Sequence, residues 1–194
     1  CYTRPWLQHD YRVALDGIAE AGFKYAGIMT DVNGRIITLE TTTGQAARIG
    51  EEARSRGLKV ASLSLGSFDV SKSLDEGISQ LKRYIDNTAS LGAPIVHFGG
   101  TSREDHMDKY IEAIGECCDY AKGKGVQLSL KTHGGFNTSG ADCRKYIERV
   151  GHKNFGLWYD PGNVYYYTDG ALNPVDDAAA IDGLVFGMSV KDFL

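Results

Sequence analysis

One unit recurs along this chain about every 30 residues: a helix that ends at or near a glycine, followed by a short apolar strand. The predicted helices span residues 10–21, 43–56, 74–91, 104–122 and 174–182, with one more capped by Ser139 and running to Val150. The predicted strands are residues 25–29, 58–65, 94–98, a run beginning at Val126, residues 154–159 and residues 184–190. Regular alternation of helices and strands indicates a parallel sheet with helices packed on it.

Two architectures fit this alternation: an open doubly wound sheet and a (β/α)8 barrel. The open sheet would carry a glycine-rich phosphate turn after an early strand, and neither GxGxxG nor GxxxxGK occurs. The barrel is therefore favoured, although a full one takes about 250 residues. We expect residues 1–194 to form a single, truncated TIM-barrel domain, with the first strand reduced to a stub at Cys1 and Tyr2 and the eighth strand absent.

Composition narrows the classes of partner. The net charge is −4 and no Lys/Arg-rich run occurs, so binding to nucleic-acid backbone is not expected. No uncharged apolar stretch reaches the roughly 18 residues that a membrane span needs. A small molecule is the expected partner, in a protein predicted to be cytoplasmic. Such barrels often pair, so a homo-oligomer is one expected state, with no stripe that marks its interface.

The cysteines show neither CxxC spacing nor the density of a disulfide scaffold. They are Cys1, Cys117, Cys118 and Cys143. We expect buried free thiols, which favours a reducing compartment.

The segment Leu-Ser-Leu-Lys-Thr-His-Gly-Gly at residues 128–135 carries the clearest chemistry. Strand alternation turns Leu128 and Leu130 toward an outer helix, and Lys131 and His133 toward the barrel interior. Barrel enzymes hold their active sites at the carboxyl ends of the strands, which is where Lys131 and His133 stand in this segment.

The same alternation collects further polar and aromatic side chains at this mouth. They are His97, Trp158, Asp160, Ser189 and Lys191. Asn163 is expected to orient a substrate hydroxyl, and Tyr165, with the two tyrosines after it, to supply a wall for sugar stacking. Asp160 has an alternative role, as a cap for the turn that follows it. Lysines and histidines around one carboxylate suit a sugar or sugar phosphate whose reaction passes through an oxyanion.

Five motifs carry a resemblance to a known family: ALDGIAEAGFKYAGIM, VHFGG, THGG, ERVGHKNFGLWYDPGNVYYY and VFGMSVKDF. With them the chain resembles the xylose-isomerase-like sugar phosphate isomerase/epimerase superfamily over nearly its whole length. The resemblance implies a (β/α)8 barrel that binds a divalent metal (Mn, Mg, Zn or Co) and interconverts ketoses, aldoses or epimers. Some relatives are dehydratases, lyases or deglycosylating enzymes.

The sequence departs from the family pattern at the metal ligands. Where relatives have Glu-Pro-His-Gly-Gly, this chain has Lys131 at the glutamate position, and where they have His-Val-His it has Gly187, Met188 and Ser189. Only Asp160 matches a usual metal ligand. A protonated lysine cannot ligate and repels a nearby cation, so a divalent metal at Asp160 is doubtful on chemical grounds.

Three roles are open for Lys131. Its ammonium can replace the metal by stabilising an enediolate while His133 moves the proton, its free amine can form a Schiff base, or it can simply neutralise Asp160. Catalytic candidates are therefore Lys131, His133 and Asp160, and binding candidates are His97, Trp158, Asn163, Tyr165 and Lys191.

The favoured function is a sugar isomerase or epimerase with an atypical, Lys-assisted site. The alternatives are a non-catalytic carbohydrate-binding barrel or divergent pseudoenzyme, and a lyase or dehydratase of keto-sugars. A relative of abasic-site endonucleases would need several zinc ligands and a cationic groove, which the sequence does not show.

Overall fold

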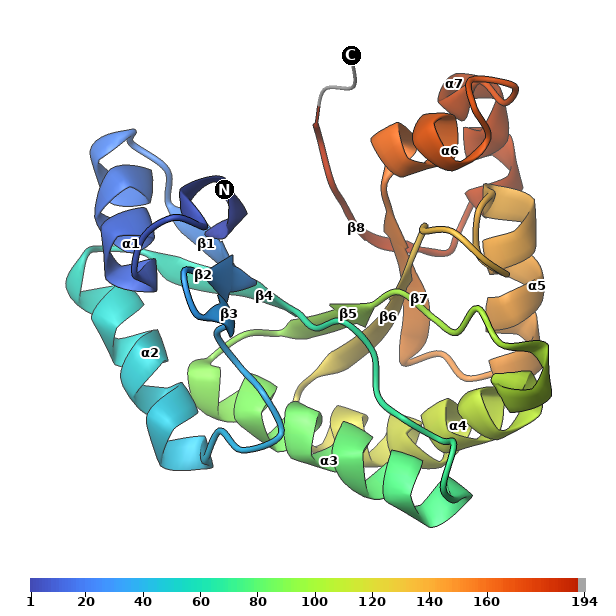
Figure 1. Ribbon diagram of the computed structural model, residues 1–194, viewed down its shortest axis with the longest axis horizontal. Coiled ribbons are helices and arrows are strands. Elements are labelled where there is room, and N and C mark those ends of the chain that lie inside the picture. The colour runs from blue at the N-terminus through green and yellow to red at the C-terminus, as the bar shows by residue number, and fades with distance from the viewer. Residues whose placement is uncertain (192–194) are drawn as a thin grey trace.

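Six short parallel strands form one curved sheet with the order β1-β4-β5-β6-β7-β8, in a computed structural model that describes residues 1–191 (Figure 1). The strands are β1 (Tyr25–Ile28), β4 (Lys59–Ser64), β5 (Ile95–Phe98), β6 (Gln127–Lys131), β7 (Phe155–Tyr159) and β8 (Val185–Met188). Each strand pairs with the next one along the chain. This order confirms the barrel architecture, because a doubly wound sheet reverses its strand order part-way. The described sheet is an open part-barrel with β1 and β8 at its edges.

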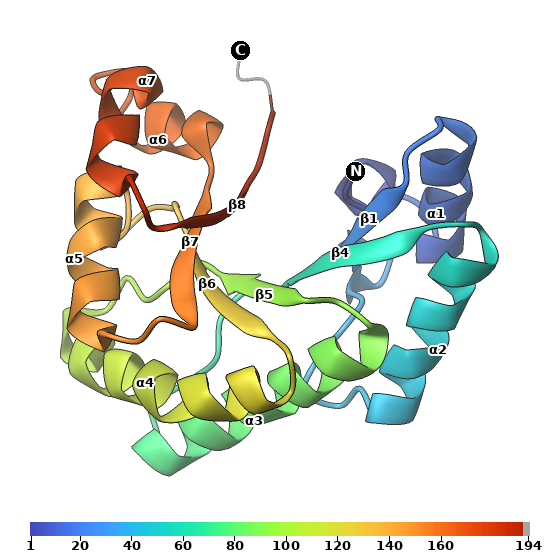
Figure 2. The same cartoon turned by 180° about the vertical axis from the view of Figure 1, so that it is seen from behind.

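Helices cover the convex face of the sheet, and the concave face is turned away from them (Figures 1 and 2). The covering helices are α1 (Tyr11–Glu20), α2 (Thr43–Ser55), α3 (Leu74–Leu91), α4 (Met107–Gly123) and α5 (Gly140–Val150). Helices α6 (Pro161–Tyr167) and α7 (Pro174–Asp177) follow β7, and three 3-10 turns lie in the connections: η1 (Arg4–Trp6), η2 (Glu104–His106) and η3 (Ala178–Ile181). Ser139 caps α5 as predicted, since its side chain accepts a hydrogen bond from the N–H of Asp142.

The predicted stub of a first strand is present at the N-terminus. Tyr2 forms an isolated parallel bridge with Gly27, and Thr3 N–H donates to the Gly27 carbonyl at 3.0 Å. A glycine is required here because a Cβ at residue 27 would lie 2.4 Å from the Tyr2 ring. Gly27 thus lets Tyr2 lie on the concave face of the sheet.

The sequence prediction missed the turn η1, the strands β2 and β3 and the helix α6, and it joined α7 and η3 into one helix. Residues 30–35 form a hairpin of β2 (Thr30–Asp31) and β3 (Gly34–Arg35), too short to give a strand pattern. Residues 161–167 form helix α6, although a turn followed by a tyrosine wall was expected. Asp160 caps this helix and Pro161 occupies its first turn, where proline costs no hydrogen bond. The predicted helix over residues 174–182 is α7 followed by η3.

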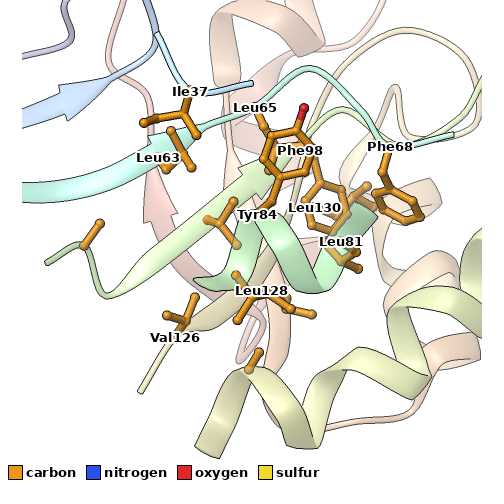
Figure 3. Close-up of a cluster of buried hydrophobic side chains, with 14 of the residues drawn as sticks. Ile37, Leu63, Leu65, Phe68, Leu81, Tyr84, Phe98, Val126, Leu128 and Leu130 are labelled. Atoms are coloured by element: carbon orange, nitrogen blue, oxygen red, sulfur yellow. The ribbon is translucent and has the colours of Figure 1, made fainter. Parts of the chain in front are cut away.

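The core lies between the sheet and the helices (Figure 3). Leu128 and Leu130 are fully buried on its sheet side, as strand alternation predicted, and pack among Leu81 and Phe98. Three cysteines are buried free thiols as expected, whereas Cys1 is exposed because it precedes the first packed element. Among the described residues, no helix is both long and apolar enough to cross a membrane.

Candidate functional site

A cavity of about 1150 Å³ occupies the concave side of the sheet and the carboxyl ends of its strands. The residues predicted from the sequence that line it are His97, Lys131, His133, Trp158, Asp160, Asn163, Tyr167, Ser189 and Lys191. They come from β5, β6, β7 and the segments that follow β6, β7 and β8. Their convergence follows from parallel strands, whose carboxyl ends share one rim.

Asp160 and two lysines form the charged centre of this cavity. The Lys131 ammonium lies 2.9 Å from Asp160 Oδ2, and the Lys191 ammonium lies 3.3 Å from the same oxygen. The Asp160 side chain is fully buried, whereas those of Lys131 and Lys191 are 18% and 42% exposed. The two ammonium groups therefore present the charge of this centre to the cavity, and the carboxylate holds them in place from below.

Backbone and amide contacts fix Asp160. Its Oδ1 accepts a hydrogen bond from Asn163 N–H at 2.9 Å, so the carboxylate caps α6 as well as pairing with the lysines. Its own N–H donates to Thr132 Oγ1 at 2.6 Å. The Asn163 amide donates to the Thr132 carbonyl at 2.8 Å and accepts from Lys191, so both ends of this amide are already engaged. Asn163 thus orients Lys191, where a contact with a substrate hydroxyl had been expected.

His97 is buried beneath the cavity as a neutral imidazole. Its ring stacks on Trp158 with centroids 4.5 Å apart, and its Nε2 lies 2.8 Å from the Tyr2 hydroxyl. Burial, with the charges of Lys131 and Arg35, holds the pKa of His97 well below its ordinary value. The Trp158 indole N–H donates to Ser189 Oγ at 2.9 Å, which fixes the stack. These rings form an aromatic floor suited to the apolar face of a sugar.

His133 is the accessible imidazole of the site. Its Nε2 lies 3.0 Å from the Tyr167 hydroxyl, which sets the orientation of the ring. Partial burial and the charges of Lys131 and Lys191 lower the pKa of His133 below 6.5, so it is neutral at pH 7. A neutral, exposed imidazole beside two ammonium groups can accept a proton from a bound molecule.

Tyr165, which was predicted to bind the substrate, is not among the residues that line this cavity. It packs against Gly170, where a Cβ would come within 3.1 Å of its ring. Because residues 161–167 are helical, successive tyrosines are turned by about 100° from one another and cannot form one wall. Tyr167 faces the cavity in place of Tyr165.

Sequence reasoning missed several cavity residues. Tyr2 donates to or accepts from Ser62 Oγ at 3.0 Å as well as meeting His97. Ser62 alternates with the core residue Leu63 on β4, so the alternation rule used for β6 could have found it. Arg35 could not be found this way, because it stands in the unpredicted hairpin.

The described residues do not fit a divalent metal. Within residues 1–191, no group of three or more His, Cys, Asp and Glu side chains is placed to hold a metal ion. The one carboxylate of the site that matches a family ligand, Asp160, is already paired with two ammonium groups. A divalent cation at this oxygen would have to displace Lys131 and Lys191.

The model of the family described as xylose isomerase-like TIM barrel matches residues 15–194. This chain belongs to that family. The predicted resemblance is thus confirmed, with the fold that it implied. No curated protein sequence matches the chain.

Solved structures show the same fold at low sequence identity. A D-psicose 3-epimerase with D-fructose superposes with a TM-score of 0.76 at 15% identity, covering 96% of this chain and 70% of that one. A xylose isomerase-like protein from Mycobacterium smegmatis in complex with magnesium superposes with a TM-score of 0.78 at 20% identity, covering 93% of this chain and 66% of that one. A probable 3-DHS dehydratase from Bacillus anthracis superposes with a TM-score of 0.70 at 12% identity, covering 92% of this chain and 66% of that one. The chain thus spans about two thirds of the length of these proteins.

Proposed function

We propose that this protein is a sugar isomerase or epimerase that moves a proton at the carbon next to a carbonyl. The observation that carries the proposal is the pair of ammonium groups, Lys131 and Lys191, held by one buried carboxylate beside the neutral imidazole of His133. The similarity to structures of sugar epimerases supports the class of reaction.

In this mechanism the carbonyl oxygen of the sugar accepts a hydrogen bond from Lys131. His133 removes the proton from the adjacent carbon, and the electron pair moves into an enediolate whose oxyanion is stabilised by Lys131 and Lys191. For isomerisation, His133 returns the proton to the neighbouring carbon, while the hydroxyl proton of the enediol passes to the former carbonyl oxygen. For epimerisation, a second proton donor on the opposite face protonates the original carbon, and His133 releases the proton that it removed to solvent.

Asp160 acts in this proposal as a positioning residue. Its carboxylate is fully buried and both of its oxygens are engaged, so it holds the two lysines and does not itself reach the substrate. The nitrogen of Lys131 is also already engaged by this carboxylate at 2.9 Å. This contact opposes a Schiff base, so borohydride treatment with a bound ketose is expected to leave Lys131 unmodified.

A second candidate is a barrel that binds a sugar without turning it over. The full burial of Asp160 between its partners favours it, because such an ion pair can be a structural feature with no role in catalysis. Dehydration of a keto-sugar is a related possibility, in which the same enediolate loses a hydroxyl group from the next carbon.

Deuterium wash-in separates these candidates. Ketoses and 3-keto sugars are incubated with the protein in heavy water and analysed by NMR for deuterium at the carbon beside the carbonyl. We expect exchange with the wild type and with His9→Gln, a substitution at an exposed histidine outside the cavity, and its loss in His133→Gln. Absence of exchange with any sugar that binds would support the non-catalytic barrel, and a new double bond in the product would support the dehydratase.

A further inference from the structure

A phenol hydroxyl, that of Tyr2, lies in the floor of the cavity. Its oxygen is 3.0 Å from Ser62 Oγ and 2.8 Å from His97 Nε2. The Tyr2 ring meets the rings of His97 and Trp158 edge to face, with centroids 5.8 and 6.3 Å away. Two polar groups therefore hold the hydroxyl in one place, and two aromatic rings hold the side chain that carries it.

The proton of His97 decides where the Tyr2 hydroxyl can donate. His97 Nδ1 is buried and has no hydrogen-bond partner within residues 1–191. A proton on Nδ1 would leave a buried donor unpaired, which proteins tolerate less well than an unpaired acceptor, so the neutral ring is assigned its proton on Nε2. His97 then donates to the Tyr2 oxygen, and the hydrogen of Tyr2 is available to Ser62 or to a bound molecule.

Ser62 and His97 can both stabilise Tyr2 after it has given up its proton. The phenolate oxygen would accept from His97 Nε2–H and from Ser62 Oγ–H, over the same 2.8 and 3.0 Å. Donors placed in advance around an oxygen that becomes charged lower the cost of that charge. Burial raises the pKa of Tyr2, although the hydrogen bond with Ser62 opposes this, so the phenol is protonated at pH 7.

Tyr2 is the strongest available acid on this floor. The neutral imidazole of His97 and the hydroxyl of Ser62 are weaker acids than a phenol. The Trp158 N–H is already used, since it donates to Ser189 Oγ at 2.9 Å. A carbanion that forms above the floor would therefore take its proton from Tyr2.

Tyr2 and His133 lie on opposite sides of the level at which Lys131 stands in the barrel. The strand register places His97, the hydrogen-bond partner of Tyr2, beside Ser129, which is one inward position before Lys131. His133 follows Lys131 by two residues, beyond the end of β6. A sugar carbonyl held at Lys131 therefore has Tyr2 beneath it and His133 above it.

From this arrangement, and resting on the proposed function, we infer that Tyr2 is the second proton donor, which makes the reaction an epimerisation. His133 removes the proton from one face of the carbon beside the carbonyl, and Tyr2 protonates the enediolate from the other face. The electron pair of the enediolate forms a C–H bond with the Tyr2 hydrogen, the carbonyl forms again, and the electron pair of the broken O–H bond stays on Tyr2 as a phenolate. Tyr2 then takes a proton from solvent while His133 releases one, so both groups return to their starting states.

Tyr2→Phe removes this proton and keeps the ring. The wild type and the variant are incubated in heavy water with D-fructose, D-ribulose or D-xylulose. NMR measures two rates for the ketose that exchanges fastest: deuterium wash-in beside the carbonyl, and formation of the epimer. We expect Tyr2→Phe to lower the rate of epimer formation at least about 100-fold and to change wash-in by less than about twofold, because His133 still removes and returns a proton on its own face. The recovered ketose is then deuterated with its configuration kept.

The matched control is Tyr120→Phe, which removes a hydroxyl that donates to Asp86 outside the cavity, and which is expected to change neither rate. If circular dichroism shows that Tyr2→Phe does not fold, Ser62→Ala replaces it. The loss of one hydrogen bond to the phenolate is expected to slow epimer formation about tenfold and to leave wash-in unchanged.

Epimer formation as fast in the variant as in the wild type, or a parallel loss of both rates, would overturn the inference, because a merely structural Tyr2 would not separate the two rates. Wash-in by the wild type without any epimer would overturn it as well, and would leave the enzyme as an isomerase. Failure of the proposed function has a different signature, which is the absence of wash-in in the wild type with every ketose that binds.

Discussion

Replacing Asp160 by Asn tests whether the charged centre is built as described. The amide keeps the shape of the side chain, and its oxygen can still accept the Asn163 N–H that caps α6. What is lost is the charge 2.9 Å from Lys131 and 3.3 Å from Lys191. The substitution therefore isolates the electrostatic contribution of the carboxylate.

Removing one partner of a fully buried ion pair costs about 3 to 5 kcal/mol. Lys131 and Lys191 are 18% and 42% exposed, so water replaces part of the lost interaction, and we expect a loss of about 2 kcal/mol in the free energy of unfolding. Urea denaturation followed by circular dichroism at pH 7 measures this difference. The matched control is Asp105→Asn, which removes a carboxylate 2.6 Å from Arg103. Both of these side chains are more than half exposed, so this substitution is expected to leave the free energy of unfolding nearly unchanged.

A double-mutant cycle with Lys131→Met sharpens the test. If Lys131 and Asp160 interact directly, Lys131→Met is expected to cost less in the Asp160→Asn background than in the wild type. Additive costs, or an Asp160→Asn variant as stable as the wild type, would show that the carboxylate does not hold the lysines and would refute this description of the site.

Three further predictions follow from the geometry. The pKa of His133 is lowered, and its neutral form accepts the proton, so kcat/KM for deuterium exchange should rise with pH through a pKa below 6.5 and be level at pH 7. A value of kcat/KM that still rises with pH above neutrality would contradict this prediction. Because the pKa of His97 is lower in the folded state than the usual 6.5, the unfolded state binds more protons as the pH falls. Urea titrations should therefore show a free energy of unfolding that is constant above about pH 6.5 and decreases below it. The decrease should be smaller in His97→Gln. Gly27→Ala should lower the melting temperature, because the new Cβ would be forced against the Tyr2 ring. Gly115→Ala in helix α4, where a Cβ has nothing within 4 Å, should raise the melting temperature, since alanine stabilises a helix by about 0.5 to 1 kcal/mol relative to glycine. The opposite order of the two melting temperatures would show that Tyr2 does not pack on the sheet.

Local patterns predicted much of the fold and the chemistry of the cavity. In β6 the alternation of Leu128 and Leu130 with Lys131 is a property of any extended chain, so the sequence indicated which side faces the helices and which the cavity. The same rule placed His97 and Asp160, because each stands in or directly after a strand. Where the backbone is helical the strand rule does not apply, and of the three tyrosines only Tyr167 lines the cavity.

The sequence by itself determined the repeated helix and strand units, the buried side of each strand, and the presence of lysines, histidines and a carboxylate near the strand ends. The tertiary structure decided that Lys131 and Lys191 share Asp160, that Tyr2 reaches His97, and that Arg35 lies over Gly66. These contacts join residues far apart in the chain, and their distances depend on the curvature of the whole sheet and on a hairpin too short to leave a pattern. Side-chain direction is a local property of the backbone, whereas the partner that a side chain meets is a property of the assembled fold.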